Sequence, residues 1–266
     1  MNRVPATPVY LPCSCRDGNG GHACRNGGIP TATPVPRLSR RHLLAVGIAA
    51  GVGAGLSCPA QAQSALSPDE ALDRLMAGNQ RLVEKRMVSL NEDLAVLKQN
   101  TAEKQEPFAA VLSCADSRVP VELVFDQSIG RVFVTRVASN IASNDTIASL
   151  GYGVAVLGTK AILVLGHANC GAVKAAIAGK AVPGQISGLY PYLRAAVERA
   201  GPDPEATSRA NASIQAKLLA TASPMISEAV AKGTVKVAAG CQSAWKGDPG
   251  SACKRVPSAG EIMTWS

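Results

Sequence analysis

The stretch FAAVLSCADSR, residues 108–118, joins a continuous apolar run to a cysteine, an aspartate and an arginine. An apolar run of this length, bounded by turn residues, predicts a strand that is buried on both faces and ends at Cys114. Strands of this kind are typical of parallel sheets that helices cover on both sides. Ligands in such sheets bind just beyond the carboxyl ends of strands. The stretch therefore predicts an α/β fold and also the place of its functional site.

Three further stretches of the chain have the same strand character. They are RVFVTRV (131–137), AILVLGH (161–167) and the weaker TVKVAAG (234–240). Helical patterns separate them, near residues 144–158, 171–179 and, broken at prolines, 187–232. This alternation predicts a central, mostly parallel β-sheet flanked by α-helices.

A helix is predicted to begin at Ser67, ahead of the first strand. Ser67 can cap the helix, Pro68 suits its first position, and Glu70 stands where a capping box requires an acid. Apolar residues follow at helical spacing. A second helix is predicted from Glu92 to Lys104.

The charge of the chain is concentrated in its leading segment. The 266 residues have a formal net charge of +8, of which six Arg and one Asp in residues 1–62 contribute +5. Residues 63–266 are therefore close to neutral, at +3, and aromatic residues make up only 3% of the chain. Nucleic-acid-binding domains concentrate basic residues on the folded part and stack bases on aromatic side chains. The composition argues against a nucleic-acid partner.

The segment LSRRHLLAVGIAAGVGAGLSCPAQAQ, residues 38–63, has the layout of an export signal. The pair Arg40 and Arg41 resembles the twin-arginine signal, and a small-residue site predicts cleavage after Ala62. The uncharged run is shorter than the ~20 residues that span a bilayer, and an uncleaved membrane anchor is the alternative. We therefore expect residues 1–62 to be a leader and signal peptide of an exported, periplasmic protein that has no stable membrane insertion after cleavage.

Two of the eight cysteines, Cys114 and Cys170, lie in the regular middle of the chain. His167 and Cys170 have an H-x-x-C spacing at the end of one predicted strand, and Cys114 ends another. Two thiolates and one imidazole suit zinc, and three protein ligands leave a tetrahedral position open, as in catalytic zinc sites. The alternatives are cysteines packed as small hydrophobic residues and a hydrogen-bonded core histidine. The spacing alone leaves both interpretations open.

Asp116 and Arg118 follow the first of these cysteines at two-residue intervals. Asp116 could occupy the fourth zinc position, or it could pair with Arg118 and accept a hydrogen bond from a zinc-bound hydroxide. An arginine–carboxylate pair favours the ionised acid. A third interpretation is a helix-capping aspartate beside a surface arginine. The sequence predicts the residue types of a site without choosing between these arrangements.

With these motifs the chain resembles the β-class carbonic anhydrases, whose members carry C-x-D-x-R followed later by H-x-x-C. The resemblance extends from about Ser67 to Gly240 and includes VFVTRVASN and LGYGVAVLGTKAILVLGHANCGAVKAA. It implies a zinc enzyme in which a zinc-bound hydroxide hydrates carbon dioxide reversibly to bicarbonate and a proton. It also implies a homodimer or higher homo-oligomer. Together with the leader, it implies a bacterial, exported member of the class with residues 63–240 as catalytic domain.

The resemblance also implies a role for each residue of the site. Cys114, His167 and Cys170 would bind Zn²⁺, Asp116 would accept the hydrogen bond of the hydroxide, and Arg118 would hold Asp116 away from the metal. In closed forms of the family the aspartate itself binds zinc. Asp116 therefore counts among the metal ligands and, with Arg118, among the catalytic residues.

The chain departs from the family pattern at three places. Ser139 stands where the family commonly has glycine, and a positive φ there would strain the serine. Val111 replaces the tryptophan of a bicarbonate-switched subgroup, so we do not predict that switch. Residues 241–266 have no strand periodicity and many breakers, and we predict an irregular tail.

Two other functions are open on the same motifs. Close relatives of the family hydrolyse carbon disulfide or carbonyl sulfide with the same fold and metal. A non-catalytic zinc-binding module would also keep the three ligands, but such a module has no use for Asp116 and Arg118.

Overall fold

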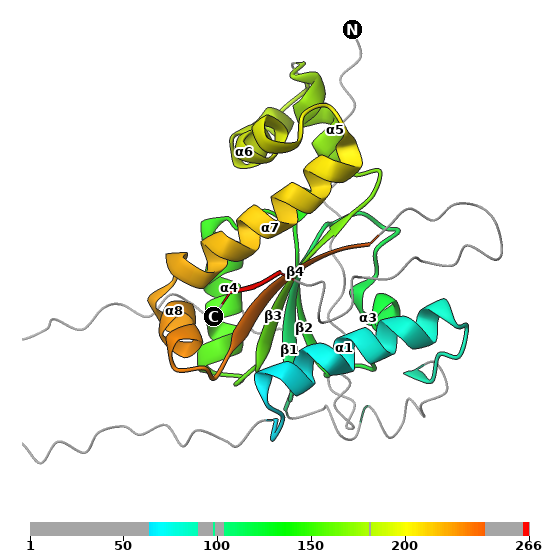
Figure 1. Ribbon diagram of the computed structural model, residues 1–266, viewed down its shortest axis with the longest axis vertical. Helices are drawn as coiled ribbons and strands as arrows, with labels where there is room; N and C mark the ends of the chain where they lie inside the picture. The colour runs from blue at the N-terminus through cyan, green and yellow to red at the C-terminus, as the bar shows by residue number, and fades with distance from the viewer. Residues whose placement is uncertain (1–63, 90–97, 99–103, 181, 243–262, 266) are drawn as a thin grey trace, which may run out of the picture. The chain divides into compact units, whose positions relative to one another are not determined.

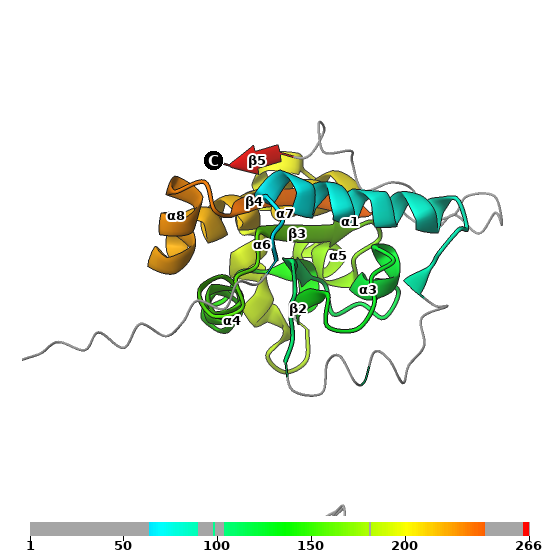
Figure 2. The same ribbon diagram turned by 90° about the horizontal axis from the view of Figure 1, so that it is seen from below.

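The structure is a computed structural model that describes residues 64–89, 98, 104–180, 182–242 and 263–265, all within one unit of the chain, Leu56–Ser266 (Figure 1). The leader and signal of residues 1–62, and most of the helix predicted from Glu92 to Lys104, lie outside the described residues. The described part has a central sheet with helices on both faces, so the predicted α/β class is confirmed (Figure 2).

Four parallel strands form the body of the sheet, in the order β2-β1-β3-β4. They are β1 (Ala109–Ser113), β2 (Val132–Arg136), β3 (Ala161–His167) and β4 (Lys236–Gln242). Every residue of β1 and β3 is buried, as the continuous apolar runs predict. The four predicted strands are therefore all present.

A fifth strand, which the sequence pattern does not predict, lies within the tail. β5 (Met263–Trp265) pairs antiparallel with β4 at the edge of the sheet. Residues 243–262 lie outside the described residues, so the prediction of an irregular tail is not tested there.

Helices cover the two faces of the sheet because side chains alternate along its central strands. Ala109 and Val111 of β1 belong to one apolar layer, and Ala110 and Leu112 belong to the other. The first layer packs against α1 (Pro68–Val83) and α3 (Val121–Val124). The second packs against α4 (Asn144–Ala155), α7 (Pro204–Ala222) and α8 (Pro224–Ala231).

Two further helices, α5 (Gly171–Ala178) and α6 (Tyr190–Ala200), lie where β3 ends (Figure 1). A third, smaller apolar cluster forms there and contains Cys114 and Cys170. None of the helices among the described residues combines the length and the hydrophobicity that a bilayer span requires.

α1 begins where the capping pattern predicts. The Ser67 hydroxyl accepts a hydrogen bond from the Glu70 backbone N–H at 3.3 Å, and the Glu70 carboxylate accepts one from the Ser67 N–H at 2.7 Å. Pro68 is the first helical residue. The box satisfies two of the N–H groups that are otherwise unpaired at the start of a helix, and the predicted helix start is confirmed.

The close approach of α1 to the chain that follows α3 depends on Gly78. A Cβ atom on Gly78 would lie 1.7 Å from the carbonyl oxygen of Phe125 and 2.6 Å from its carbonyl carbon. Both atoms belong to the backbone, so rotation of a side chain would not relieve the overlap. The position therefore requires glycine for steric reasons.

We expect Gly78→Ala to lower the free energy of unfolding by about 3 kcal/mol, the upper end of the usual range for overpacking of a core, because the overlap is with the backbone. The gain in helix propensity, up to about 1 kcal/mol, is too small to offset the overlap. The matched control is Gly151→Ala in the middle of α4, where the atom nearest to the new Cβ is the Ser223 hydroxyl at 3.6 Å. Urea unfolding of both variants measures the difference, and equal stability of the two would contradict the expectation.

The parallel register brings the carboxyl ends of neighbouring strands to one edge of the sheet. Ser113 of β1 pairs with Arg136 of β2 and with Leu165 of β3. Cys114 therefore comes directly after this level, and His167 lies two residues beyond it on the neighbouring strand. Both sequence motifs emerge at the same place in the fold, where ligands bind in open α/β sheets.

Candidate metal centre

Cys114, His167 and Cys170 converge on one point. Cys114 directly follows β1, His167 is the last residue of β3, and Cys170 is the N-cap of α5. Their two sulfur atoms and a ring nitrogen lie within 4.8 Å of one another. All three residues are buried, with at most 4% of their surface exposed, and both cysteines are free thiols. The predicted convergence of the three side chains is therefore confirmed.

The H-x-x-C turn is shaped and held by its backbone. Asn169 has a φ of 61°, a conformation that asparagine adopts more readily than most residues. The Ala168 N–H donates to the Gln242 carbonyl of β4 at 2.8 Å, and the Asn169 carbonyl accepts a hydrogen bond from the Arg118 guanidinium at 3.3 Å. The turn is therefore tied to β4 on one side and to the C-x-D-x-R segment on the other.

The environment of His167 suits a metal ligand. Its Nδ1 lies 3.0 Å from the Ala168 carbonyl oxygen, an arrangement in which Nδ1 carries the proton and Nε2 keeps its lone pair. Nε2 is buried and has no hydrogen-bond partner among the described residues. Burial of an unpaired nitrogen is unfavourable, and a bound cation would satisfy it.

Each of the two thiols shifts the pKa of the other. The hydrogen bond with Cys170, and then burial, raise the pKa of Cys114, whereas the same hydrogen bond lowers the pKa of Cys170. Two buried thiolates side by side repel each other, so the pair does not readily carry two negative charges. A divalent cation removes this conflict by binding both sulfurs as thiolates. Two sulfurs and one imidazole nitrogen fit zinc chemically.

Arg118 holds Asp116 in a two-pronged ion pair. The Arg118 Nε donates to Oδ1 of Asp116 at 2.8 Å and the Nη2 donates to Oδ2 at 2.7 Å, while the backbone N–H of Arg118 adds a third hydrogen bond to Oδ1 at 3.0 Å. The side-chain hydrogen bond from Arg118 holds the pKa of Asp116 well below its usual range. The carboxylate is therefore ionised and can only accept hydrogen bonds.

This carboxylate lies at the edge of the cluster of cysteines and histidine. Oδ2 of Asp116 is 3.9 Å from Nε2 of His167. Among the described residues, the group whose ligand atoms share one point consists of the two cysteines and the histidine, without Asp116. Of the three arrangements that the sequence left open, the structure shows the pairing of Asp116 with Arg118. The backbone N–H of Arg118 also donates to the Asp116 carboxylate, as in the turn that a capping aspartate forms.

A second arginine, which the motifs do not single out, holds the backbone of the C-x-D-x-R segment. Arg136 at the end of β2 donates from Nε to the Cys114 carbonyl at 3.0 Å and from Nη2 to the Asp116 carbonyl at 2.6 Å. Its signal in the sequence is its place at the end of a predicted strand. That signal becomes informative only with the knowledge that β2 is the neighbour of β1.

Ser139 has a left-handed backbone conformation, which glycine adopts without strain. Its φ is 61° and its ψ is 24°, inside the short 3₁₀ segment Ala138–Asn140. A non-glycine residue in this region costs about 1 kcal/mol or more. The expected positive φ is therefore present, and the chain bears its cost next to the metal centre.

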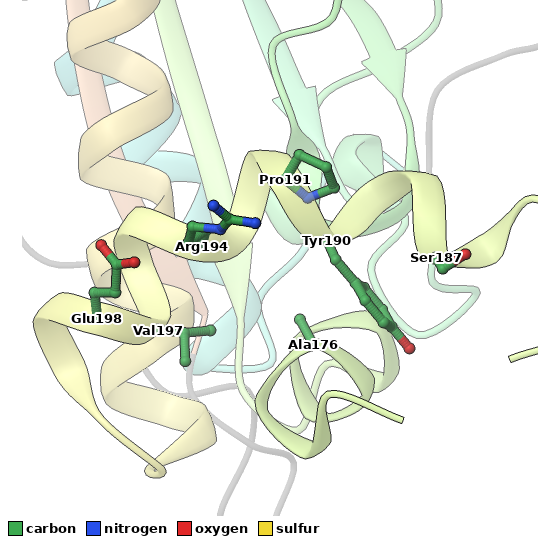
Figure 3. A pocket seen from close by; sticks show the side chains of 7 residues that line it. All are labelled: Ala176, Ser187, Tyr190, Pro191, Arg194, Val197 and Glu198. Atoms are coloured by element: carbon green, nitrogen blue, oxygen red, sulfur yellow. The ribbon is translucent and has the colours of Figure 1, made fainter. Parts of the chain in front are cut away.

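A pocket of about 490 Å³ lies between α5 and α6 (Figure 3). Its lining includes Ala176 of α5 and Tyr190, Arg194 and Glu198 of α6. None of the three cluster residues lines it. The metal centre, with its convergent donors, is therefore the better candidate for the functional site.

Comparison with known proteins gives one consistent family. Residues 109–248 match the family model described as carbonic anhydrase. Carbonic anhydrase 2 of Mycobacterium tuberculosis is 38% identical over 136 residues, which are 51% of this chain and 64% of that protein. A carbonic anhydrase of Pseudomonas aeruginosa is 39% identical over 103 residues, 36% of this chain and 46% of that protein. The chain thus spans less than two thirds of the length of these relatives.

Solved structures show the same likeness. The β-carbonic anhydrase of Coccomyxa, in complex with acetazolamide, has a TM-score of 0.53 at 26% identity, over 69% of this chain and 85% of that one. A structure from a study of two tetrameric β-carbonic anhydrases of Sordaria macrospora has a TM-score of 0.53 at 22% identity, over 65% of this chain and 92% of that one. At this lower identity the second likeness shows the fold alone.

Proposed function

This chain belongs to the β-class carbonic anhydrase family, and on that premise we propose that it catalyses the reversible hydration of carbon dioxide to bicarbonate and a proton. The observation that carries the proposal is the buried Cys114–His167–Cys170 cluster beside an ionised carboxylate. A site that only stabilised the fold would need the cluster but not the carboxylate. The pairing of Asp116 with Arg118 therefore favours catalysis over a purely structural metal site.

The three cluster residues would hold a zinc ion through their sulfur atoms and the Nε2 of His167. A zinc ion held by these residues would supply a nucleophile at neutral pH, because it would lower the pKa of a bound water to about 7. Nδ1 of His167 stays turned to the Ala168 carbonyl, which fixes the ring and leaves Nε2 free to bind.

Asp116 would orient the attacking oxygen. Its carboxylate is ionised, lies 3.9 Å from Nε2 of His167, and can accept a hydrogen bond but not donate one. By accepting a hydrogen bond from the attacking oxygen, the carboxylate would turn a lone pair of that oxygen toward the substrate. Arg118, through its three hydrogen bonds, and Arg136, which holds the Asp116 carbonyl, keep the carboxylate in place.

Apolar side chains beside the cluster suit a small, uncharged substrate. Ile141, Val173 and Leu193 form a buried cluster with Cys114 and Cys170. Carbon dioxide is linear and has no net dipole, so an apolar wall accepts it without loss of hydrogen bonds. Bicarbonate, the charged product, finds no hydrogen-bond partners on these apolar side chains, so we expect it to leave the site.

Zinc content and carbon dioxide hydration, measured on the same purified sample, test the proposal together. We expect one zinc ion per chain and a hydration rate above the uncatalysed rate, followed by the colour change of a pH indicator after rapid mixing. Carbon disulfide and carbonyl sulfide are the comparison substrates. Zinc-loaded protein that hydrolyses either of these but does not hydrate carbon dioxide would contradict the proposal, as would a folded sample that binds no zinc.

We also propose that the protein is exported through the twin-arginine pathway to the periplasm and works as a homo-oligomer. Export is supported by Arg40, Arg41 and the small-residue site at Ala62. Export after folding would protect Cys114 and Cys170 from forming a disulfide in an oxidising compartment. We expect the N-terminal sequence of the exported protein to begin at Gln63. A mature protein that still carries Arg40 would contradict cleavage.

A further inference from the structure

We propose that Ser139 is a positioning residue that donates one hydrogen bond to each of the two metal-binding sulfurs and so strengthens zinc binding. This inference rests on the zinc site of the proposed function. It concerns a residue with a strained backbone conformation, and it gives that strain a chemical role.

The contacts of Ser139 reach both sulfurs. Its backbone N–H donates to Sγ of Cys114 at 3.2 Å, and its hydroxyl oxygen lies 3.4 Å from Sγ of Cys170. A cysteine that binds a metal as a thiolate has no proton to give, so the hydroxyl is the donor in the second contact. Ser139 is completely buried, and water does not compete for these bonds.

Two buried side chains of α7 hold Ser139 in place. Nδ2 of Asn211 donates to the Ser139 carbonyl at 2.8 Å, and Oδ1 of Asn211 accepts a hydrogen bond from Nε2 of Gln215 at 3.0 Å. Oε1 of Gln215 in turn accepts the backbone N–H of Ala142 at 2.9 Å. The turn is thus held at Ser139 and again three residues later, so the fold sets the position of the Ser139 backbone and places its hydroxyl near Cys170.

A glycine at this position could supply only half of this arrangement. Glycine adopts a φ of 61° without strain, and its N–H could still donate to Cys114, but it has no hydroxyl for Cys170. Each thiolate brings a full negative charge into a buried site, and charge-assisted hydrogen bonds stabilise such groups. Compared with glycine, serine at this position adds backbone strain and provides a second hydrogen-bond donor to the metal site.

The test compares Ser139→Ala with Ser139→Gly, because both remove the hydroxyl and only alanine keeps the backbone strain. We expect both variants to bind Zn²⁺ about tenfold or more weakly than the wild type, the effect typical of hydrogen bonds to metal ligands. Competition with a chromophoric chelator at constant pH measures the affinity. In the Co²⁺-substituted proteins we expect the sulfur-to-cobalt absorption to move to longer wavelength in both, since the thiolate electrons are held less tightly.

The matched control is Ser113→Ala. Ser113 is also completely buried and directly precedes Cys114, but its hydroxyl has no hydrogen-bond partner among the described residues. We expect this variant to bind Zn²⁺ as tightly as the wild type and to leave the cobalt spectrum unchanged. A loss of affinity equal to that of the Ser139 variants would show a general response to packing and overturn the inference.

The remaining outcomes separate this inference from the proposed function. If the Ser139→Gly variant binds Zn²⁺ like the wild type and only Ser139→Ala is weakened, the backbone controls affinity and the hydroxyl has no role. If neither variant is weakened while the wild type binds zinc and hydrates carbon dioxide, the inference fails alone. A wild type that binds Zn²⁺ tightly but does not hydrate carbon dioxide would contradict the proposed function without contradicting the inference about Ser139. A wild type that binds no zinc would overturn both.

Discussion

The replacement of His167 by alanine is expected to give a folded protein that binds zinc much more weakly and no longer hydrates carbon dioxide measurably. The imidazole is one of three donors whose atoms lie within 4.8 Å of one another, and its Nε2 has no hydrogen-bond partner among the described residues. Four-ligand zinc sites bind with about 10–16 kcal/mol, which corresponds to about 3 kcal/mol for one ligand. We therefore expect roughly a hundredfold loss of zinc affinity, visible by chelator competition, and a rate indistinguishable from the uncatalysed one.

A cysteine outside the cluster provides the control for this prediction. Cys241 on β4 is a free, half-buried thiol and does not belong to the group that could hold a metal. Cys241→Ala is expected to keep both zinc and activity. Circular dichroism of both variants verifies that they are folded. An unchanged zinc affinity in a folded His167→Ala variant would remove the histidine from the ligand set and with it the proposed centre.

A change of Asp116 to asparagine is expected to separate metal binding from catalysis. The carboxylate is outside the three-donor cluster, so zinc should be retained. Asparagine has nearly the same shape but carries no charge, so it loses the ionic part of its bond to Arg118, and an NH2 donor replaces one of the two acceptor oxygens. We expect the hydration rate to fall by at least about a hundredfold, the lower range for loss of a positioned proton acceptor. Zinc content and hydration rate are measured on the same sample.

Glu228→Gln serves as the control for charge removal. Glu228 is an exposed carboxylate of α8 that pairs with Lys232 at 3.3 Å, and its substitution should change neither zinc content nor rate.

The low pKa of Asp116, caused first by the Arg118 hydrogen bond, bears on the pH profile as well. A carboxylate whose pKa is depressed on folding stays ionised above that value and loses its favourable pairing only as the pH falls through it. A wild-type rate in Asp116→Asn at neutral pH would mean that the carboxylate has no catalytic role.

The sequence determined the elements of the fold and the residue types of the centre. Buried strands such as 109–113 and 161–167 are continuous apolar runs. The capping box at the start of α1 is formed by Ser67 and Glu70, which are only three positions apart. Both are local signals, because periodicity and capping depend on neighbours along the chain. The parallel arrangement then follows from strands alternating with helices, and it places the cysteine and histidine motifs at one edge.

Tertiary structure alone decided how the centre is supported. Arg136 reaches the carbonyls of Cys114 and Asp116 only because β2 lies next to β1, and Asn211 reaches Ser139 across 72 positions of the chain. No periodicity in the sequence predicts that Asp116 pairs with Arg118. The same is true of the pairing of the short strand β5 with β4. Hydrogen bonds of this kind depend on the distance and direction between two side chains after packing. Local pattern does not encode those quantities, so the motifs predicted which residues meet and the packed fold decided how they are held.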